Sequence, residues 1–281
     1  MEPFGLRLHT KMAACSHLCV GIDPHPSILA DWGLADTPEN LVFFGRSLID
    51  AAQAGGAAAV KPQSALFERH GSGGIGALEK VLAYGAEVDM LTVLDVKRGD
   101  IGSTMRGYAE AYLADGSPLA ADAVTLSPYL GFGALRPALE LAGRTGRGVF
   151  VLAFTSNPEG TAIQRAVTAS GLGVGESVIR DVAETNAGAA PMGSVGVVIG
   201  ATVGSLPPKG AQLITQVNGP ILAPGLGAQG GQVEDLGRLF GRARDLVLVT
   251  SARTIAGAGP DPERVVAAIR HSAANLSFLG I

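Results

Sequence analysis

Cysteine, aromatic residues and runs of positive charge are scarce in this sequence, and each scarcity excludes a class of protein. The two cysteines, Cys15 and Cys19, exclude a disulfide framework, and their CxxxC spacing is a weak zinc signal, so we expect reduced thiols near the first strand. One Trp and four Tyr leave no aromatic platform on which bases could stack. Lys and Arg total 21 against 25 Asp and Glu with no basic tract, which makes nucleic acids and anionic membranes poor partners.

The sequence also shows no pattern that is typical of a membrane-spanning segment or an export signal. Residues 1–20 lack the long apolar run of a signal peptide. No residue between Thr185 and Pro208 is charged, but Gly, Pro, Ser and Thr interrupt this stretch, which is typical of a buried strand between loops. The five histidines show no metal-ligand spacing and no Ser-His-Asp context. We therefore expect a cytoplasmic protein that binds neither membranes nor nucleic acids.

The sequence does contain eight short apolar runs that are rich in β-branched residues. Most are continuous and not alternating, as expected for parallel strands that are buried on both faces. These runs cover residues 18–23, 58–62, 91–97, 123–127, 149–156, 195–202, 220–225 and 246–252.

Stretches with the apolar spacing of helices follow these runs. The clearest begins with Thr37 as N-cap and Pro38 in the first turn. The alternation of eight strands with eight helices predicts the α/β class and a single (β/α)8 TIM barrel, with residues 1–281 as one catalytic domain. Residues 156–173 are the longest stretch without a regular pattern. The predicted helices cover residues 37–55, 75–87, 103–115, 133–143, 175–188, 206–217, 233–243 and 261–276, of which 206–217 is the weakest.

Polar residues end most of the predicted strands, where a barrel of this kind carries its active site. Because the C-terminal ends of parallel strands form one rim, these side chains should converge. Their regular position predicts a catalytic or binding site on that rim. The residues at or just after the strand ends are Asp23, Lys61, Asp95, Lys97, Ser127, Ser156 and Arg253.

The third strand ends in a cluster of charges that begins with Asp95 and Lys97. Side chains two residues apart on a strand share a face, so these two point the same way, and Lys61 on the adjacent strand supplies a second cation. Asp100 lies just past the strand, and Thr104 lies one turn along the next helix. We predict an alternating Lys–Asp–Lys–Asp array at the barrel mouth. An ion-pair network that only closes the barrel is the structural alternative.

The pattern D-x-K-x-x-D-I-x-x-T at residues 95–104 resembles the orotidine 5′-monophosphate decarboxylase family. The resemblance spans the chain through "GIDP", "AVKPQ", "TSNPEG", "APGLGAQGG" and "SARTI", and the length and "TSNPEG" are similar to the longer bacterial (type 2) branch. It implies conversion of orotidine 5′-monophosphate (OMP) to UMP and CO2 in pyrimidine biosynthesis, without a metal or any other cofactor.

The resemblance also implies roles for the charged residues. Loss of CO2 from C6 of the pyrimidine leaves a carbanion that fixed protein charges must stabilise. Lys97 would be the cation beside C6 and the acid that protonates it. Asp95 would lie near the departing carboxylate, and Lys61 and Asp23 would hold ribose hydroxyls and keep the array aligned.

Five further residues complete the site by the same resemblance. Asp100 and Thr104 would reach into the site of a neighbouring subunit, which implies a homodimer. Gln229, in the Gly-rich loop after the seventh strand, would bridge phosphate and base, and Arg253 would grip the phosphate dianion. Ser156 would read the pyrimidine edge. The Gly-rich loop as an ordinary turn and Ser156 as a turn or cap residue remain the structural alternatives.

Three other interpretations stay open. Metal-dependent 3-keto-gulonate-phosphate decarboxylases and hexulose-phosphate synthases share DxKxxD, but they carry an acidic metal ligand on the second strand, where this sequence has Lys61. Gly225, Gly227 and Gly230 spell G-x-G-x-x-G after a strand, with Asp245 twenty residues beyond the first glycine, although the motif falls in the seventh strand unit. The third is a module that binds nucleotide without turnover.

Overall fold

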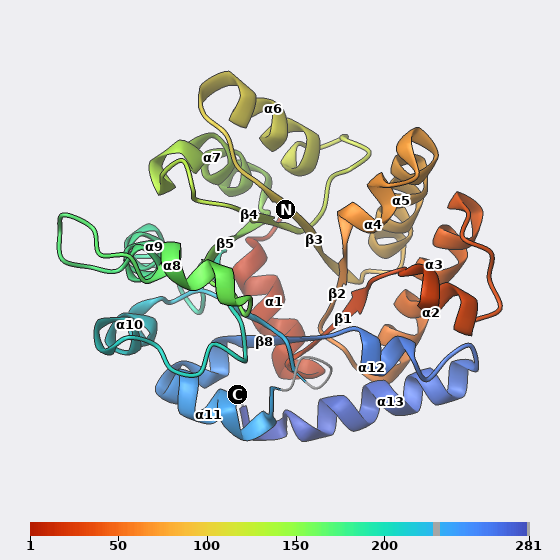
Figure 1. The fold of residues 1–281 in the computed structure, drawn as a ribbon. Helices are drawn as coiled ribbons and strands as arrows, with labels where there is room; N and C mark the ends of the chain where they lie inside the picture. Colours follow the sequence, from red (N-terminus) through yellow and green to blue (C-terminus); the bar gives the residue numbers. More distant parts are fainter. Residues whose placement is uncertain (227–230, 280–281) are drawn as a thin grey trace.

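Eight parallel strands close into a barrel in the computed structural model, which describes residues 1–226 and 231–279 (Figure 1). Each strand pairs with its neighbour in the sequence, and β1 also pairs with β8. The predicted (β/α)8 barrel is therefore confirmed, and all eight predicted strands form. They are β1 (Leu18–Ile22), β2 (Ala59–Pro62), β3 (Leu91–Arg98), β4 (Ala123–Leu126), β5 (Gly148–Phe154), β6 (Val195–Ile199), β7 (Ile221–Pro224) and β8 (Val247–Ser251).

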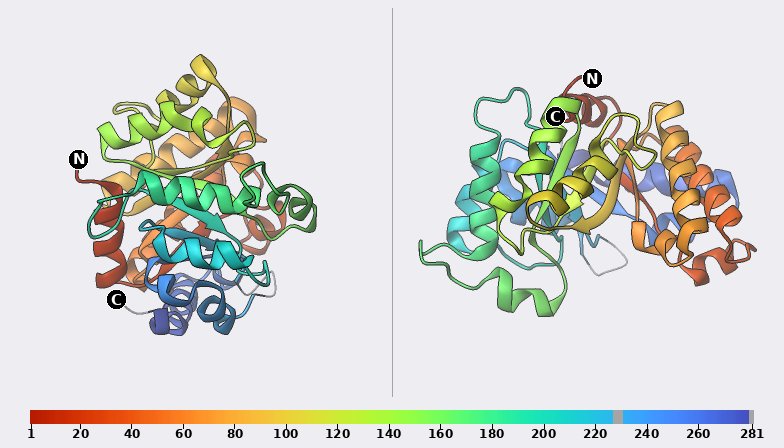
Figure 2. Two further views of the ribbon diagram at one scale, coloured as in Figure 1. Left: turned by 90° about the vertical axis from the view of Figure 1, so that its left-hand side faces the viewer. Right: turned by 90° about the horizontal axis from the view of Figure 1, so that it is seen from above.

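Helices surround the barrel, and the eight predicted ones all form (Figures 1 and 2). Thr37 caps the first of them as expected, because its hydroxyl accepts a hydrogen bond from the backbone N–H of Asn40. The predicted helices are α3 (Pro38–Gly55), α5 (Gly71–Glu87), α6 (Gly102–Leu113), α7 (Arg136–Thr145), α9 (Val174–Thr185), α10 (Pro208–Leu213), α11 (Val233–Phe240) and α13 (Pro262–Asn275). The sequence interpretation missed α1 (Phe4–Ala14), α2 (Pro26–Asp31), α4 (Ser64–Glu68), α8 (Thr161–Gln164) and α12 (Arg253–Ala256).

Helix α1 lies across one end of the barrel, and Figure 1 shows it in the middle of the ring of strands. Its buried side chains, Phe4, Leu8 and Met12, join the apolar cluster of the barrel interior. The Phe4 ring packs edge-on against Phe150 and lies directly over Gly148, where a Cβ would collide with it. The helix therefore closes the barrel with apolar side chains.

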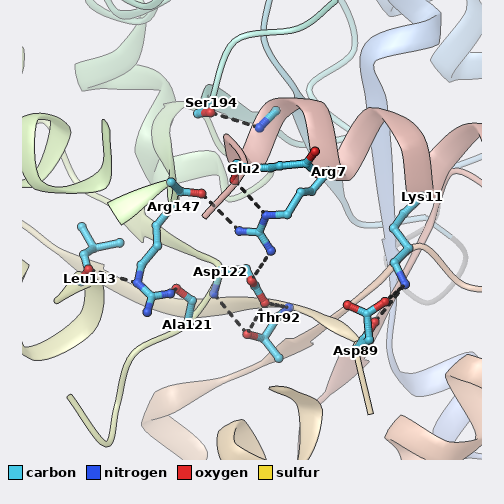
Figure 3. A network of polar contacts seen from close by, with 12 residues as sticks. Glu2, Arg7, Lys11, Asp89, Thr92, Leu113, Ala121, Asp122, Arg147 and Ser194 are labelled. Atoms are coloured by element: carbon cyan, nitrogen blue, oxygen red, sulfur yellow. Dashed lines mark hydrogen bonds and ion pairs between the residues drawn. The ribbon is translucent and has the colours of Figure 1, made fainter. Parts of the chain in front are cut away.

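Polar contacts hold α1 at the N-terminal ends of the strands (Figure 3). Arg7 forms a 2.6 Å ion pair with Asp122, just before β4, and Lys11 pairs with Asp89, just before β3. The backbone N–H of Gly5 donates to the Ser194 hydroxyl, just before β6. The opposite end of the barrel remains open for a site, and in Figure 2 (left) the segment between β5 and α9 projects from that end.

The cysteines and the uncharged stretch occupy ordinary positions in this fold. Cys15 is exposed, Cys19 is buried in β1, and both are free thiols. Burial raises the pKa of the Cys19 thiol to about 12. The uncharged stretch forms β6 between two loops. Within the described residues, no helix combines the length and apolar character that crossing a membrane requires.

Candidate active site

Three of the predicted site residues meet at the open mouth of the barrel. The Asp95 carboxylate on β3 lies between two lysines, with Oδ2 2.9 Å from Lys61 Nζ and Oδ1 2.6 Å from Lys97 Nζ. The side chains of Asp95 and Lys61 are 8% and 6% exposed, whereas that of Lys97 is 46% exposed. The two lysines therefore differ in access: Lys61 is enclosed with its carboxylate, and Lys97 is open.

Electrostatic attraction keeps the buried pair charged. Burial is the largest influence on Asp95 and opposes its ionisation, but attraction to Lys61 and Lys97 and their hydrogen bonds outweigh it, so the pKa of Asp95 lies well below its usual range. Burial likewise opposes the charged form of Lys61, and attraction to Asp95 and Asp23 raises the Lys61 pKa above its usual range. Both groups therefore remain ionised throughout the neutral range of pH.

Lys97 reaches Asp95 from an irregular backbone. The register between β3 and β4 shifts between Leu94 and Arg98, and Lys97 has a φ of 45°, in the left-handed region that non-glycine residues rarely adopt. The sequence predicted that the two side chains point the same way, and in the structure they contact each other through Lys97 Nζ and Asp95 Oδ1. Regular strand alternation is not the reason for this contact, because both residues lie within a bulge of β3 that turns the Lys97 backbone.

Two residues that the sequence interpretation did not single out complete the surroundings of Asp95. The Gln63 side-chain amide donates to Asp95 Oδ2 at 3.1 Å, and the Thr125 hydroxyl donates to Asp95 Oδ1 at 2.8 Å. Gln63 lies two residues past Lys61, and Thr125 is the polar residue of β4, so the two-residue period of the strands could have identified both. Each carboxylate oxygen thus accepts two hydrogen bonds.

A cavity of about 510 Å³ opens over this cluster, a volume in the range of small-molecule sites. Its lining includes Ser156, exposed after β5, and Arg253, exposed at the start of α12. It also includes Asp23, whose buried Oδ1 has no hydrogen-bond partner among the described residues. A buried acceptor beside a cavity is suited to bind a hydroxyl donor of a ligand. Six of the nine predicted site residues line this cavity: Asp23, Lys61, Asp95, Lys97, Ser156 and Arg253.

Asp100 and Thr104 lie apart from the cluster. Asp100 is half-buried, and its carboxylate accepts a hydrogen bond from the N–H of Ile101 beside it. Thr104 is exposed on the first turn of α6. Neither residue belongs to the described lining of the cavity. Within one chain, three members of the predicted Lys–Asp–Lys–Asp array come together: Lys61, Asp95 and Lys97. The fourth member, Asp100, does not join them.

The ninth predicted residue, Gln229, lies outside the described residues. The flanks of its loop are described: the Gly231 N–H donates to the carbonyl of Gly225, and Gly225 has a φ of 102°. Gly225 follows the seventh strand of a closed barrel and not the first strand of an open doubly wound sheet. The dinucleotide-binding interpretation of this glycine pattern is therefore wrong.

The segment after β5 has more structure than the sequence indicated. It contains α8 and a bridge between Val167 and Gly173. Gln164 ties α8 to the strand end, because its side chain accepts from the Thr155 N–H at 2.9 Å and donates to the Thr155 hydroxyl at 2.6 Å. Gln164 and Thr155 both line the cavity. Two hydrogen bonds to a neighbour nine residues away organise this segment, and local periodicity could not predict them.

No three His, Cys, Asp or Glu side chains in residues 1–226 and 231–279 come together as a possible metal site. The metal-dependent interpretation of the DxKxxD pattern expects an acidic ligand on the second strand. This chain has Lys61 there, engaged with Asp95.

The fold and the site define a (β/α)8-barrel enzyme with a charged cluster at the C-terminal rim of its strands. Residues 16–269 match the orotidine 5′-phosphate decarboxylase / HUMPS family, and the chain belongs to that family. It is 52% identical to the orotidine 5′-phosphate decarboxylase of Salinispora arenicola over 273 residues, which cover 97% of this chain and 95% of the relative. The Streptomyces coelicolor protein of the same name is 49% identical over 261 residues, covering 93% and 92%.

Solved structures agree with the family and the fold. The chain superposes on a Streptomyces avermitilis protein assigned to orotidine 5′-phosphate decarboxylase with a TM-score of 0.92 and 47% identity, covering 99% of this chain and 96% of that one. The OMP decarboxylase of Leishmania donovani gives a TM-score of 0.76 at 29% identity, covering 99% and 98%. This chain is therefore similar to these proteins over nearly its whole length.

Proposed function

We propose that this enzyme converts OMP to UMP and CO2. The observation that carries the proposal is the Asp95 carboxylate held between Lys61 and Lys97 at the base of a cavity of about 510 Å³. The names of relatives at about half sequence identity support the same reaction. We also propose that it acts in pyrimidine biosynthesis in the cytoplasm.

The proposed chemistry uses fixed charge and one proton. The bond between C6 and the carboxylate carbon breaks, its electron pair stays on C6, and CO2 departs. Lys97, the more open of the two lysines, stabilises the developing carbanion and then gives C6 a proton from Nζ. Lys61 is enclosed with Asp95, so Lys61 is suited to hold the Asp95 carboxylate in place and to bind the ribose. Asp95 keeps Lys97 beside C6 and lies near the departing carboxylate.

The remaining groups bind the rest of the nucleotide in this proposal. Asp23 accepts a hydrogen bond from a ribose hydroxyl at Oδ1, which has no partner among the described residues, and Ser156 contacts the pyrimidine edge. Arg253 binds the phosphate, since it lies exposed on the rim where its guanidinium can pair with two phosphate oxygens. Gln229 is proposed to bridge phosphate and base on the family resemblance alone.

A homodimer in which Asp100 and Thr104 enter the partner's site is part of this proposal. Both residues lie outside the cavity of their own chain. Large apolar side chains are exposed on the segments that follow β3 and β4. Ile101, next to Asp100 in the sequence, is 61% exposed, and Tyr129 and Leu130, on the loop after the adjacent strand β4, are 76% and 52% exposed. Exposed apolar groups of this size favour a protein interface.

Purified enzyme is expected to consume OMP at the same rate with and without EDTA. The reason is that the proposed chemistry uses Lys97 and not a metal ion as the electrophile. The measurement is the loss of orotidylate absorbance, with UMP and CO2 quantified in equal amounts. If EDTA abolishes turnover and Mg²⁺ restores it, the metal-dependent relatives become the better description.

Arg253→Ala is expected to lower kcat/KM strongly for OMP and much less for the phosphate-free nucleoside orotidine. Binding energy from the phosphate stabilises the transition state only when the phosphate is present. Loss of one charge-assisted contact of this kind corresponds to roughly 10- to 100-fold for OMP. Arg270→Ala, an exposed arginine on α13, is the matched control. Equal fractional losses on both substrates would show that Arg253 does not contact the phosphate.

A further inference from the structure

The Thr125 hydroxyl makes three hydrogen bonds at the centre of the charged cluster. It donates to Asp95 Oδ1 at 2.8 Å, and it accepts from the backbone N–H groups of Val96 at 3.1 Å and Lys97 at 3.0 Å. The Thr125 residue is 1% exposed. A hydroxyl has one proton to donate and two lone pairs to accept with, so these bonds use its full capacity.

These bonds coincide with the bulge in β3. Leu94 pairs with Val124 and Arg98 pairs with Leu126, so three residues of β3 lie opposite Thr125 alone. Two N–H groups of the extra residues take the hydroxyl as their acceptor. The bulge contains the positive φ of Lys97, a conformation that persists only where its surroundings hold it.

We propose that Thr125 is a positioning residue for the reaction. Its hydroxyl holds the bulge that turns Lys97 toward Asp95, and it orients the carboxylate that Lys97 contacts. This inference rests on the proposed function, since it concerns the lysine that protonates C6. Thr125 acts on the chemistry through Asp95 and Lys97 and not by binding the ribose or the phosphate.

Thr125→Val tests this role because valine keeps the shape of threonine and removes the hydroxyl. We expect kcat for OMP to fall by about 10- to 100-fold, the scale expected when a reacting group shifts by about 1 Å. KM and the dissociation constant of UMP should remain within about threefold, since the contacts to ribose and phosphate are retained. Thr125→Ser, which restores the hydroxyl, should recover kcat to within about threefold of wild type.

Thr92→Val is the matched control. Thr92 is also a buried threonine, on β3, and its hydroxyl donates to Asp122 at 3.1 Å and accepts from the Asp122 N–H, but at the closed end of the barrel (Figure 3). Its replacement should lower the melting temperature and leave kcat unchanged. If Thr125→Val does not fold, Thr125→Ala replaces it in these experiments, because alanine also lacks the hydroxyl.

A second readout does not depend on activity. Hydrogen exchange of the Val96 and Lys97 amides, followed by NMR, should speed up by about tenfold or more in Thr125→Val and stay at the wild-type rate in Thr125→Ser. Absence of OMP turnover by the wild-type enzyme would refute the proposed function. Separately, unchanged exchange of the two amides in Thr125→Val would refute the inference that the Thr125 hydroxyl stabilises the bulge. The positioning role is wrong if wild type is active and Thr125→Val keeps kcat within threefold, or if Thr125→Ser is as impaired as Thr125→Val.

Discussion

Lys97→Ala is expected to lower kcat for OMP by about 10⁴-fold or more, because one side chain is proposed to supply two effects. Removing a preorganised charge that stabilises a developing anion costs about 10²- to 10³-fold, and removing a general acid costs about 10²- to 10⁴-fold. The fold should survive, since Lys97 is 46% exposed and Asp95 keeps its contacts with Lys61, Gln63 and Thr125. Single-turnover loss of orotidylate absorbance measures the effect.

Two comparisons separate this effect from a general loss of charge. Lys80→Ala, an exposed lysine on α5, should keep full activity. Lys97→Arg keeps a positive charge but has a guanidinium that does not release its proton near neutral pH, so its activity should remain low. Near wild-type turnover by Lys97→Arg would contradict the role of Lys97 as the acid, and retention of a tenth of the wild-type kcat by Lys97→Ala would contradict both roles.

Mixing inactive Asp100→Ala subunits with inactive Lys97→Ala subunits is expected to restore activity. If Asp100 serves the partner's site and Lys97 serves its own, each heterodimer contains one doubly altered site and one intact site. Activity should then reach at most about half of the wild-type value per heterodimer when the sites are independent. The position of Asp100 outside the cavity of its own chain motivates this expectation.

The activity of the mixture is interpretable only when exchange of subunits has been demonstrated. Chains with different affinity tags, mixed and purified in two steps, yield heterodimers whose activity is measured directly. A mixture of Lys97→Ala with Asp95→Ala is the matched control, because both residues lie in the same site and no intact site can form. If the Asp100 heterodimers form and remain as inactive as their parents, Asp100 does not act across the interface.

The strands and most of the helices were predictable because their signals are local. A parallel strand buried on both faces needs an unbroken apolar run, and a surface helix needs apolar residues every three or four positions. Helix α1 was missed although its buried residues Phe4, Leu8 and Met12 recur every four positions, the spacing of a helix with one apolar face. Its partner is the barrel interior at Gly148 and Phe150, which lie far away in the sequence.

The sequence by itself determined the order of the elements, the barrel and the rim on which Asp23, Lys61, Asp95, Lys97, Ser156 and Arg253 converge, because the C-terminal ends of parallel strands share one side of a barrel. Only the tertiary structure decided how Asp95 is held. Its contacts with Gln63 and Thr125 depend on the register between neighbouring strands and on a bulge at Lys97. Register and bulges arise from pairing between distant segments, so no local pattern specifies them.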